Sequence, residues 1–220
     1  LSRLDTIVTN YRKIGLSATV KNASSVLSFL SQKKKSITLN VEEKSSPNIE
    51  ILKTDNRVPW SGHMAGYAIK DIYKKIQNST MSIVFVNTRA QAELIFNKLW
   101  HENEKNLKIA VHHGSLEKEI RRKVENMMSL GQLDCVVATS SLDLGIDWGN
   151  VNLVIQIGSP KGIARFLQRI GRSNHRLNEP SKAILVPSNR FEYLECVSAI
   201  SSIKEKILDE TIEKEGSLDV

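Results

Sequence analysis

The feature that most constrains the fold is an alternation of short apolar runs with longer amphipathic stretches. Apolar runs of four to six residues lie at 13–17, 36–41, 82–86, 107–111, 135–138, 153–157 and 183–186. Since these runs show no polar alternation, they predict strands buried on both faces, as in a parallel sheet. Stretches with helical periodicity lie at 65–77, 89–103, 116–130, 161–170 and 190–207. The pattern predicts a doubly wound α/β domain, with helices on both faces of a mostly parallel sheet.

Polar residues follow four of these runs, at 87–89, 112–115, 139–141 and 158–160. In open parallel sheets, ligands bind at the edge where the strands end. The four polar segments therefore predict a binding edge on this domain.

Composition narrows the classes of function. The 220 residues carry 31 Lys and Arg against 24 Asp and Glu, a net charge of +7, which fits a polyanionic partner without establishing one. Cys135 and Cys196 lie in apolar surroundings and predict reduced core thiols of a cytosolic protein. The histidines show no zinc-ligand spacing, so no protein metal site is expected. No apolar stretch approaches the roughly 20 residues of a membrane helix.

The sharpest local string runs from Gln168 to Arg176 and brings three arginines together around Gly171. Guanidinium groups bind phosphate oxygens in pairs, and a glycine lets the backbone approach a ligand, so the string predicts phosphate recognition. The alternative is a solvated basic helix end. The order Gln-Arg-x-Gly-Arg resembles the arginine-finger motif of superfamily-two helicases.

Other segments support this resemblance in the expected order, from about residue 14 to 200. Ser17-Ala18-Thr19 resembles the helicase coupling motif, and 84–89 is similar to the strand and turn that open the second RecA-like domain. Residues 112–116 and 138–147 resemble the two following loops, of which the second touches both nucleic acid and nucleotide. The resemblance implies a RecA-like fold.

A finer resemblance is to the Lhr (large helicase-related) family, carried by 58–64, 111–116, 144–149 and 169–176. Residues 174–176 and 189–196 resemble its ligase-associated DEXH-box branch. This resemblance implies an ATP-dependent, 3′-to-5′ single-stranded DNA translocase or helicase of DNA repair. It also implies a bacterial cytoplasmic, nucleoid-associated location, and a DNA ligase and a nuclease as candidate partners.

Two motifs of such helicases are missing: no Gly-x-x-x-x-Gly-Lys-Ser/Thr phosphate loop occurs, and no Asp-Glu-x-His precedes Ser17. We therefore expect ATP and Mg²⁺ to be held mainly by a missing first domain, and this segment alone to be inactive. The predicted divisions are a first-domain remnant at 1–30, a strand-containing connector at 31–56, the second RecA-like domain at 57–207 and a tail at 208–220. Ile14 and Leu16 are expected to dock on the remaining domain, to pair with another copy or to disorder.

The resemblance gives roles to the arginine string. Arg172 is the expected arginine finger, with a surface salt bridge as the alternative. Arg169 is either a phosphate ligand or a structural clamp. Gln168 is expected near the γ-phosphate or its water, unless it is a helix-surface glutamine. The third arginine of the motif falls at His175, and Arg176 is the candidate replacement.

The remaining site residues divide into two groups. Gly145 and Asp147 are expected beside the nucleotide, with a turn aspartate as the alternative for Asp147. The expected nucleic-acid contacts are Asn87, Thr88, Arg89, His113, Gly114, Thr139 and Ser140. Structural alternatives are a helix cap for Thr88, a buried strand end for Thr139 and a structural role for His113.

The sequence also suggests roles for two tryptophans and allows two alternative functions. Trp148 is expected either to stack on a base or to pack, and Trp60 to act as a packing staple. One rival function is a non-catalytic nucleic-acid or partner-binding module with the same fold. The other is an RNA helicase domain, which shares the same motifs.

Overall fold

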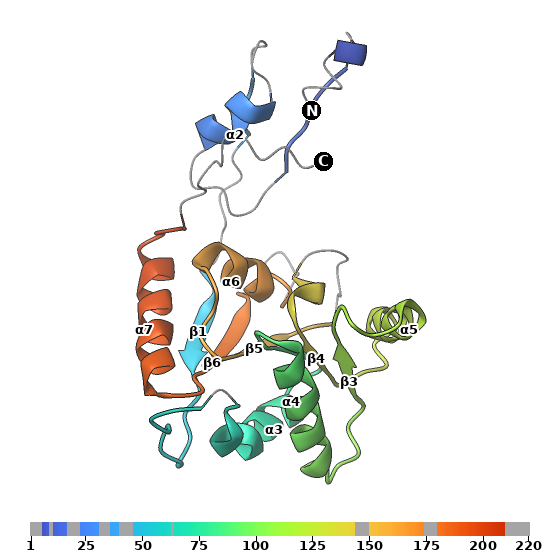
Figure 1. Cartoon of the computed structure of the whole chain (residues 1–220), viewed down its shortest axis with the longest axis vertical. Coiled ribbons are helices and arrows are strands. Elements are labelled where there is room, and N and C mark those ends of the chain that lie inside the picture. The colour runs from blue at the N-terminus through green and yellow to red at the C-terminus, as the bar shows by residue number, and fades with distance from the viewer. Residues whose placement is uncertain are drawn as a thin grey trace.

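A six-stranded, entirely parallel sheet forms the centre of the computed structural model, which describes residues 6–8, 11–16, 23–30, 36–39, 46–62, 64–143, 150–173 and 180–209 (Figure 1). The strands are β1 (Asn48–Ile51), β2 (Ser82–Phe85), β3 (Ile109–His112), β4 (Cys135–Ala138), β5 (Leu153–Ile157) and β6 (Lys182–Val186). Their spatial order is β1-β6-β5-β2-β4-β3. The parallel arrangement places every strand's carboxyl end at one edge.

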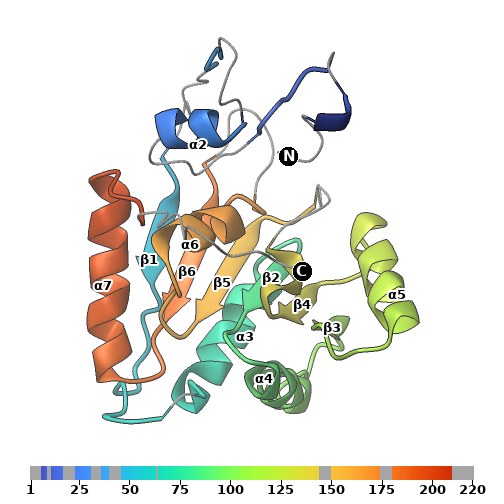
Figure 2. The same cartoon turned by 45° about the horizontal axis from the view of Figure 1, so that its top comes forward.

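Helices cover both faces of this sheet. The helical elements are α2 (Ala23–Leu30), η1 (Gly66–Ala68), α3 (Ile69–Gln77), α4 (Arg89–His101), α5 (Lys118–Ser129), η2 (Ser140–Leu142), α6 (Ile163–Ile170) and α7 (Arg190–Lys204). α3 and α4 contribute to the core on one face, while α5, α6 and α7 contribute to the core on the other (Figure 2). Among the described helices, none is long and apolar enough to cross a membrane.

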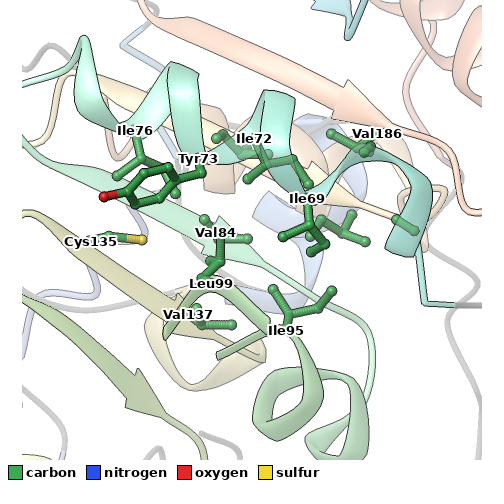
Figure 3. Packing of buried hydrophobic residues seen from close by; sticks show 14 of the residues in the cluster. Ile69, Ile72, Tyr73, Ile76, Val84, Ile95, Leu99, Cys135, Val137 and Val186 are labelled. Carbon is green, nitrogen blue, oxygen red and sulfur yellow. The ribbon is translucent and has the colours of Figure 1, made fainter. Parts of the chain in front are cut away.

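The packing of α3 on the sheet shows why the apolar runs that form the strands have no alternating polar residues. Its buried side chains recur at Ile69, Ile72, Tyr73 and Ile76, the helical spacing that forms one face, and they lie over Val84 of β2 (Figure 3). Every residue of β2, β4 and β5 is buried, because helices cover both sides of these strands. The doubly wound α/β prediction is therefore confirmed.

The prediction was wrong for two strands. Residues 36–39 and 11–16 form no strand, and Ile14, Leu16, Ile37 and Leu39 are all exposed. The connector's strand is instead β1, which pairs with β6 in the register Asn48–Lys182. A strand needs a neighbouring strand for its hydrogen bonds, and β1 occupies this edge of the sheet. Since Ile14 and Leu16 are exposed, the first expectation for them, docking on the domain, is not met.

Both cysteines are buried and free, which confirms the prediction of core thiols. Burial raises the pKa of the Cys196 thiol to about 12 and that of Cys135 further above its ordinary value. Because a thiol must ionise to act as a nucleophile or metal ligand, these two side chains serve packing.

Candidate nucleotide and nucleic-acid interface

The turn after β2 is built around a helix cap. The Thr88 hydroxyl accepts a hydrogen bond from the Gln91 backbone N–H at 3.2 Å, and the Gln91 side-chain oxygen accepts from the backbone N–H groups of Asn87 and Thr88. This capping box begins α4 and fixes the turn. The capping alternative for Thr88 is therefore confirmed, and Arg89 is left exposed beside it.

His113, after β3, is buried and held between two neighbours. Its Nε2 lies 2.7 Å from Glu93 Oε1 on α4, and its Nδ1 accepts from the Ser115 N–H at 3.3 Å. This contact pattern fits the structural alternative for His113. Gly114 follows it and is exposed, with open space where a side chain would lie.

His112 connects three elements from a fully buried position. Its Nε2 lies 3.1 Å from Glu125 Oε1 on α5, and its Nδ1 lies 2.7 Å from the Ser141 hydroxyl. Burial lowers the pKa of His112, an effect that the Glu125 hydrogen bond partly opposes. A carboxylate only accepts, so the neutral ring carries its proton on Nε2, while the Ser141 hydroxyl beside Nδ1 donates to the His112 carbonyl at 3.0 Å. His112 thereby ties the loop after β4 to α5.

Thr139 directly follows β4 and has little exposure. Its side chain is buried, and its backbone N–H donates to the His112 carbonyl at 3.3 Å. This geometry fits the buried strand-end alternative, since the N–H expected to meet a DNA phosphate already has a partner. Ser140, which begins η2, is exposed at the same edge.

Arg169 is enclosed by the domain. Its Nε donates to Asp143 Oδ1 at 2.7 Å, and its Nη1 donates to Gln156 Oε1 at 2.6 Å. The guanidinium also lies 4.8 Å from the centre of the Phe85 ring. With only 3% of its surface exposed, Arg169 acts as a clamp between α6, η2 and β5, which is the structural alternative weighed above.

Arg172 occupies a different position. It follows Gly171 at the end of α6, its backbone N–H donates to the Arg169 carbonyl at 3.0 Å, and its side chain is only half-buried. A side chain at Gly171 would come within 3.3 Å of the Leu167 carbonyl, so this tight turn suits glycine. Gln168 is also half-buried.

Several predicted residues lie outside the described parts of the chain. These are Ser17, Ala18, Thr19, Gly145, Asp147, Trp148, His175 and Arg176. Trp60 is described, and its predicted role as a packing staple was wrong. It is 68% exposed and instead stacks under the Arg190 guanidinium at 4.0 Å.

Sequence reasoning missed two partners of the arginine clamp, Asp143 and Gln156. Gln156 carried a usable signal, because it is the single polar residue in the apolar run that forms β5. In the described ranges, no three His, Cys, Asp or Glu side chains are placed to hold a metal ion.

A parallel RecA-like sheet, polar turns at its carboxyl edge and an arginine-bearing helix after the fifth strand define a helicase motor domain as the class of protein. Residues 67–177 match the family model of the helicase conserved C-terminal domain. The chain belongs to this family.

Relatives along the whole chain are Lhr helicases. It is 34% identical to ATP-dependent helicase Lhr-Core of Methanothermobacter thermautotrophicus, covering 100% of this chain and 27% of that protein. It is 31% identical to Lhr helicase/uracil glycosylase of Escherichia coli, covering 100% of this chain and 17% of that protein. The chain thus spans about a quarter or less of these relatives.

Solved structures agree with the sequence relatives. Mycobacterium smegmatis helicase Lhr bound to ssDNA and AMP-PNP superposes with a TM-score of 0.76 at 33% identity, covering 89% of this chain and 26% of that chain. S. cerevisiae Dbp5 bound to RNA and ADP BeF3 gives a TM-score of 0.67 at 19% identity, covering 87% of this chain and 48% of that chain, which is a likeness of fold alone.

Proposed function

We propose that this chain is the second motor domain of an ATP-dependent helicase that translocates on single-stranded DNA. The observation that carries the proposal is the separation of roles between two arginines, one in the last turn of α6 and one just beyond it. Arg169 is buried in a clamp, whereas Arg172 stands half-exposed one turn further on. Similarity to an Lhr helicase bound to ssDNA and AMP-PNP supports the same assignment.

In this proposal, ATP lies between this domain and a first RecA-like domain that supplies the phosphate loop and the Mg²⁺ ligands. Bound ATP and Mg²⁺ supply the phosphoryl group and its counter-charge. The Arg172 guanidinium stabilises negative charge that develops on the transferred phosphoryl, a contribution of roughly 10³–10⁵ in rate in well-studied NTPases. Arg169 holds the end of α6 so that Arg172 meets the phosphate in one orientation. We further propose that Gln168, Arg176, Gly145 and Asp147 lie around the nucleotide.

The DNA strand runs along the carboxyl edge of the sheet. Arg89, Gly114 and Ser140 are exposed there and lie on three different turns. Contacts of this kind reach the phosphate backbone, so binding is largely independent of sequence and weakens with salt. Asn87, Thr88, His113 and Thr139 act mainly by shaping these turns.

The finer biological setting follows the Lhr resemblance. We infer 3′-to-5′ movement, a role in DNA repair within a bacterial cytoplasm and nucleoid, and a DNA ligase and a nuclease as partners. Membership of the ligase-associated DEXH-box branch belongs to the same inference. A competition between matched DNA and RNA strands separates this proposal from an RNA helicase.

The test is ATP hydrolysis by the natural full-length protein, with and without single-stranded DNA, beside its Arg172→Ala variant. We expect DNA-stimulated turnover that falls by about 10³ or more in the variant while DNA affinity is kept. The control is Arg122→Ala, an exposed arginine on α5, which should retain turnover. Absence of turnover in the natural protein with DNA binding intact would make this a binding module.

A further inference from the structure

A series of side-chain hydrogen bonds links α6 to the turn after β2 by way of β5. Arg169 Nη1 donates to Gln156 Oε1 at 2.6 Å, and Gln156 Nε2 donates to Asn87 Oδ1 at 3.5 Å. Asn87 Nδ2 then donates to the Ser159 carbonyl at 3.0 Å. These residues come from α6, from β5 and from the turn after β2. The helix that precedes Arg172 is therefore connected to the turn that precedes Arg89.

The direction of each bond in this series is fixed. A guanidinium group only donates hydrogen bonds, so the Gln156 oxygen must face Arg169. The Gln156 NH₂ group then donates one proton to the Ile157 carbonyl at 2.9 Å and the other to Asn87 Oδ1. The Asn87 oxygen must then accept, which turns its own NH₂ group toward the Ser159 carbonyl. A shift of Arg169 cannot be absorbed by rotating either amide without losing a bond.

Gln156 is an unexpected residue for its position. It is fully buried, and its neighbours in β5 are Leu153, Val154, Ile155 and Ile157. An apolar side chain would form the strand without the cost of removing an amide from water. Its register partner in β2 is Phe85, whose ring lies against Arg169, so Gln156 faces α6.

We propose that Gln156 is a positioning residue that couples the nucleotide-facing end of α6 to the DNA-facing turn at Asn87. The Arg172 backbone is bonded to the Arg169 carbonyl, so a nucleotide that draws Arg172 forward also moves Arg169. Gln156 passes this displacement to Asn87, and the binding of nucleotide and the binding of DNA reinforce each other. The inference rests on the proposed function.

The experiment measures this reinforcement directly in the natural full-length protein. Binding of a fluorescent single-stranded oligothymidylate is titrated with and without a non-hydrolysable ATP analogue, and the ratio of the two dissociation constants is the linkage factor. In the unaltered protein we expect a factor within the range of about 5 to 150 that is common for allosteric coupling. In Gln156→Met it should fall to near 1, while DNA affinity without nucleotide changes by about twofold or less.

Two further variants make the result specific. Gln156→Glu keeps an oxygen that accepts from Arg169, but it presents an acceptor to Asn87 where the amide presents a donor. This variant should therefore also lose the linkage. Ser82→Ala removes another fully buried polar group, at the opposite end of β2, and should keep the linkage. Thermal unfolding shows which variants are folded at the assay temperature.

Linkage that survives in the folded Gln156 variants would overturn the inference, as would an equal loss in Ser82→Ala. An unaltered protein that binds neither oligothymidylate nor the analogue would contradict the proposed function itself. Binding measurements on the unaltered protein therefore distinguish failure of the proposed function from failure of the inference about Gln156.

Discussion

Arg169 and Asp143 lie 26 residues apart in the sequence and form an ion pair that is enclosed by the domain, with Nε and Oδ1 2.7 Å apart. Both side chains are more than 90% buried. Removing one partner of such a pair leaves the other charged and out of water. Loss of one partner of this pair should therefore destabilise the domain more than loss of a surface arginine.

The first prediction separates the two arginines by stability. Arg169→Ala should lower the free energy of unfolding by about 3–5 kcal/mol, since it leaves the buried Asp143 carboxylate with only the more distant Arg165 Nε, at 3.7 Å. Arg172→Ala should cost much less, because its side chain is half-exposed. Urea unfolding of the 220-residue chain measures both. Equal losses in the two variants would remove the clamp assignment. The double variant Arg169→Met with Asp143→Leu should recover part of the loss.

The second prediction concerns Gly158, which has φ +79°. A Cβ at this position would lie 3.0 Å from Asn87 Nδ2. Gly158→Ala should therefore lower the free energy of unfolding by about 1–2 kcal/mol through the left-handed backbone alone, and it should also displace the Asn87 turn. Thermal unfolding and oligonucleotide binding are the measurements. Gly114→Ala is the control for stability, since open space surrounds that glycine, and a comparable loss there would undermine the argument.

The third prediction is a pH dependence of stability caused by His112. Burial lowers the pKa of His112 below its ordinary value of 6.5 in the folded chain. Between the lowered pKa of the folded chain and 6.5, His112 is protonated more often in the unfolded chain than in the folded one. The free energy of unfolding therefore falls as pH falls below 6.5. Above that value the contribution is fully present.

His112→Asn should flatten this dependence by up to about 1.4 kcal/mol per pH unit, the limit for one proton. Urea unfolding at several pH values between 7.5 and 5 compares the variant with the unaltered chain. The matched control is His101→Asn, at the exposed end of α4. A slope that is the same with and without His112 would show that other groups cause it.

The fourth prediction tests the exposed contact after β2. Arg89→Ala should weaken single-stranded DNA binding and reduce the slope of log K against log salt concentration by about 0.7, the value for one phosphate contact. Its stability should be unchanged, because the Thr88 cap remains. Titrations at several salt concentrations provide the slope, and Lys204→Ala at the far end of α7 serves as the control. An unaltered slope in Arg89→Ala would place the DNA elsewhere.

The strands of the central sheet could be predicted because burial on both faces leaves a continuous apolar run. β1 could not be predicted in the same way. It lies at an edge and alternates between exposed and half-buried residues, in a connector whose more apolar run at 36–41 was the stronger candidate. Its position depends on a partner, β6, that lies far away in the sequence.

The site was predictable at the level of motifs and less so at the level of roles. The string from Gln168 to Arg172 indicated two arginines near the end of one helix. It could not show that Arg169 is the buried one and Arg172 the half-exposed one, because the burial of Arg169 depends on Asp143 and Gln156. These partners lie 26 and 13 residues from Arg169, and no local pattern joins them. The exposure of Trp60 likewise follows from a tertiary contact with Arg190.

The pairing of β1 with β6 has a consequence for synthesis of the chain. Asn48 leaves the ribosome long before Lys182, its register partner, has been translated. At about 5–20 residues per second, translation of the intervening segment takes on the order of ten seconds, and during this time the backbone groups of β1 have no strand to bond with. The sheet can be completed only when its last strand has emerged. A ribosome stalled shortly before residue 182 should therefore hold a chain whose first strand is still sensitive to protease.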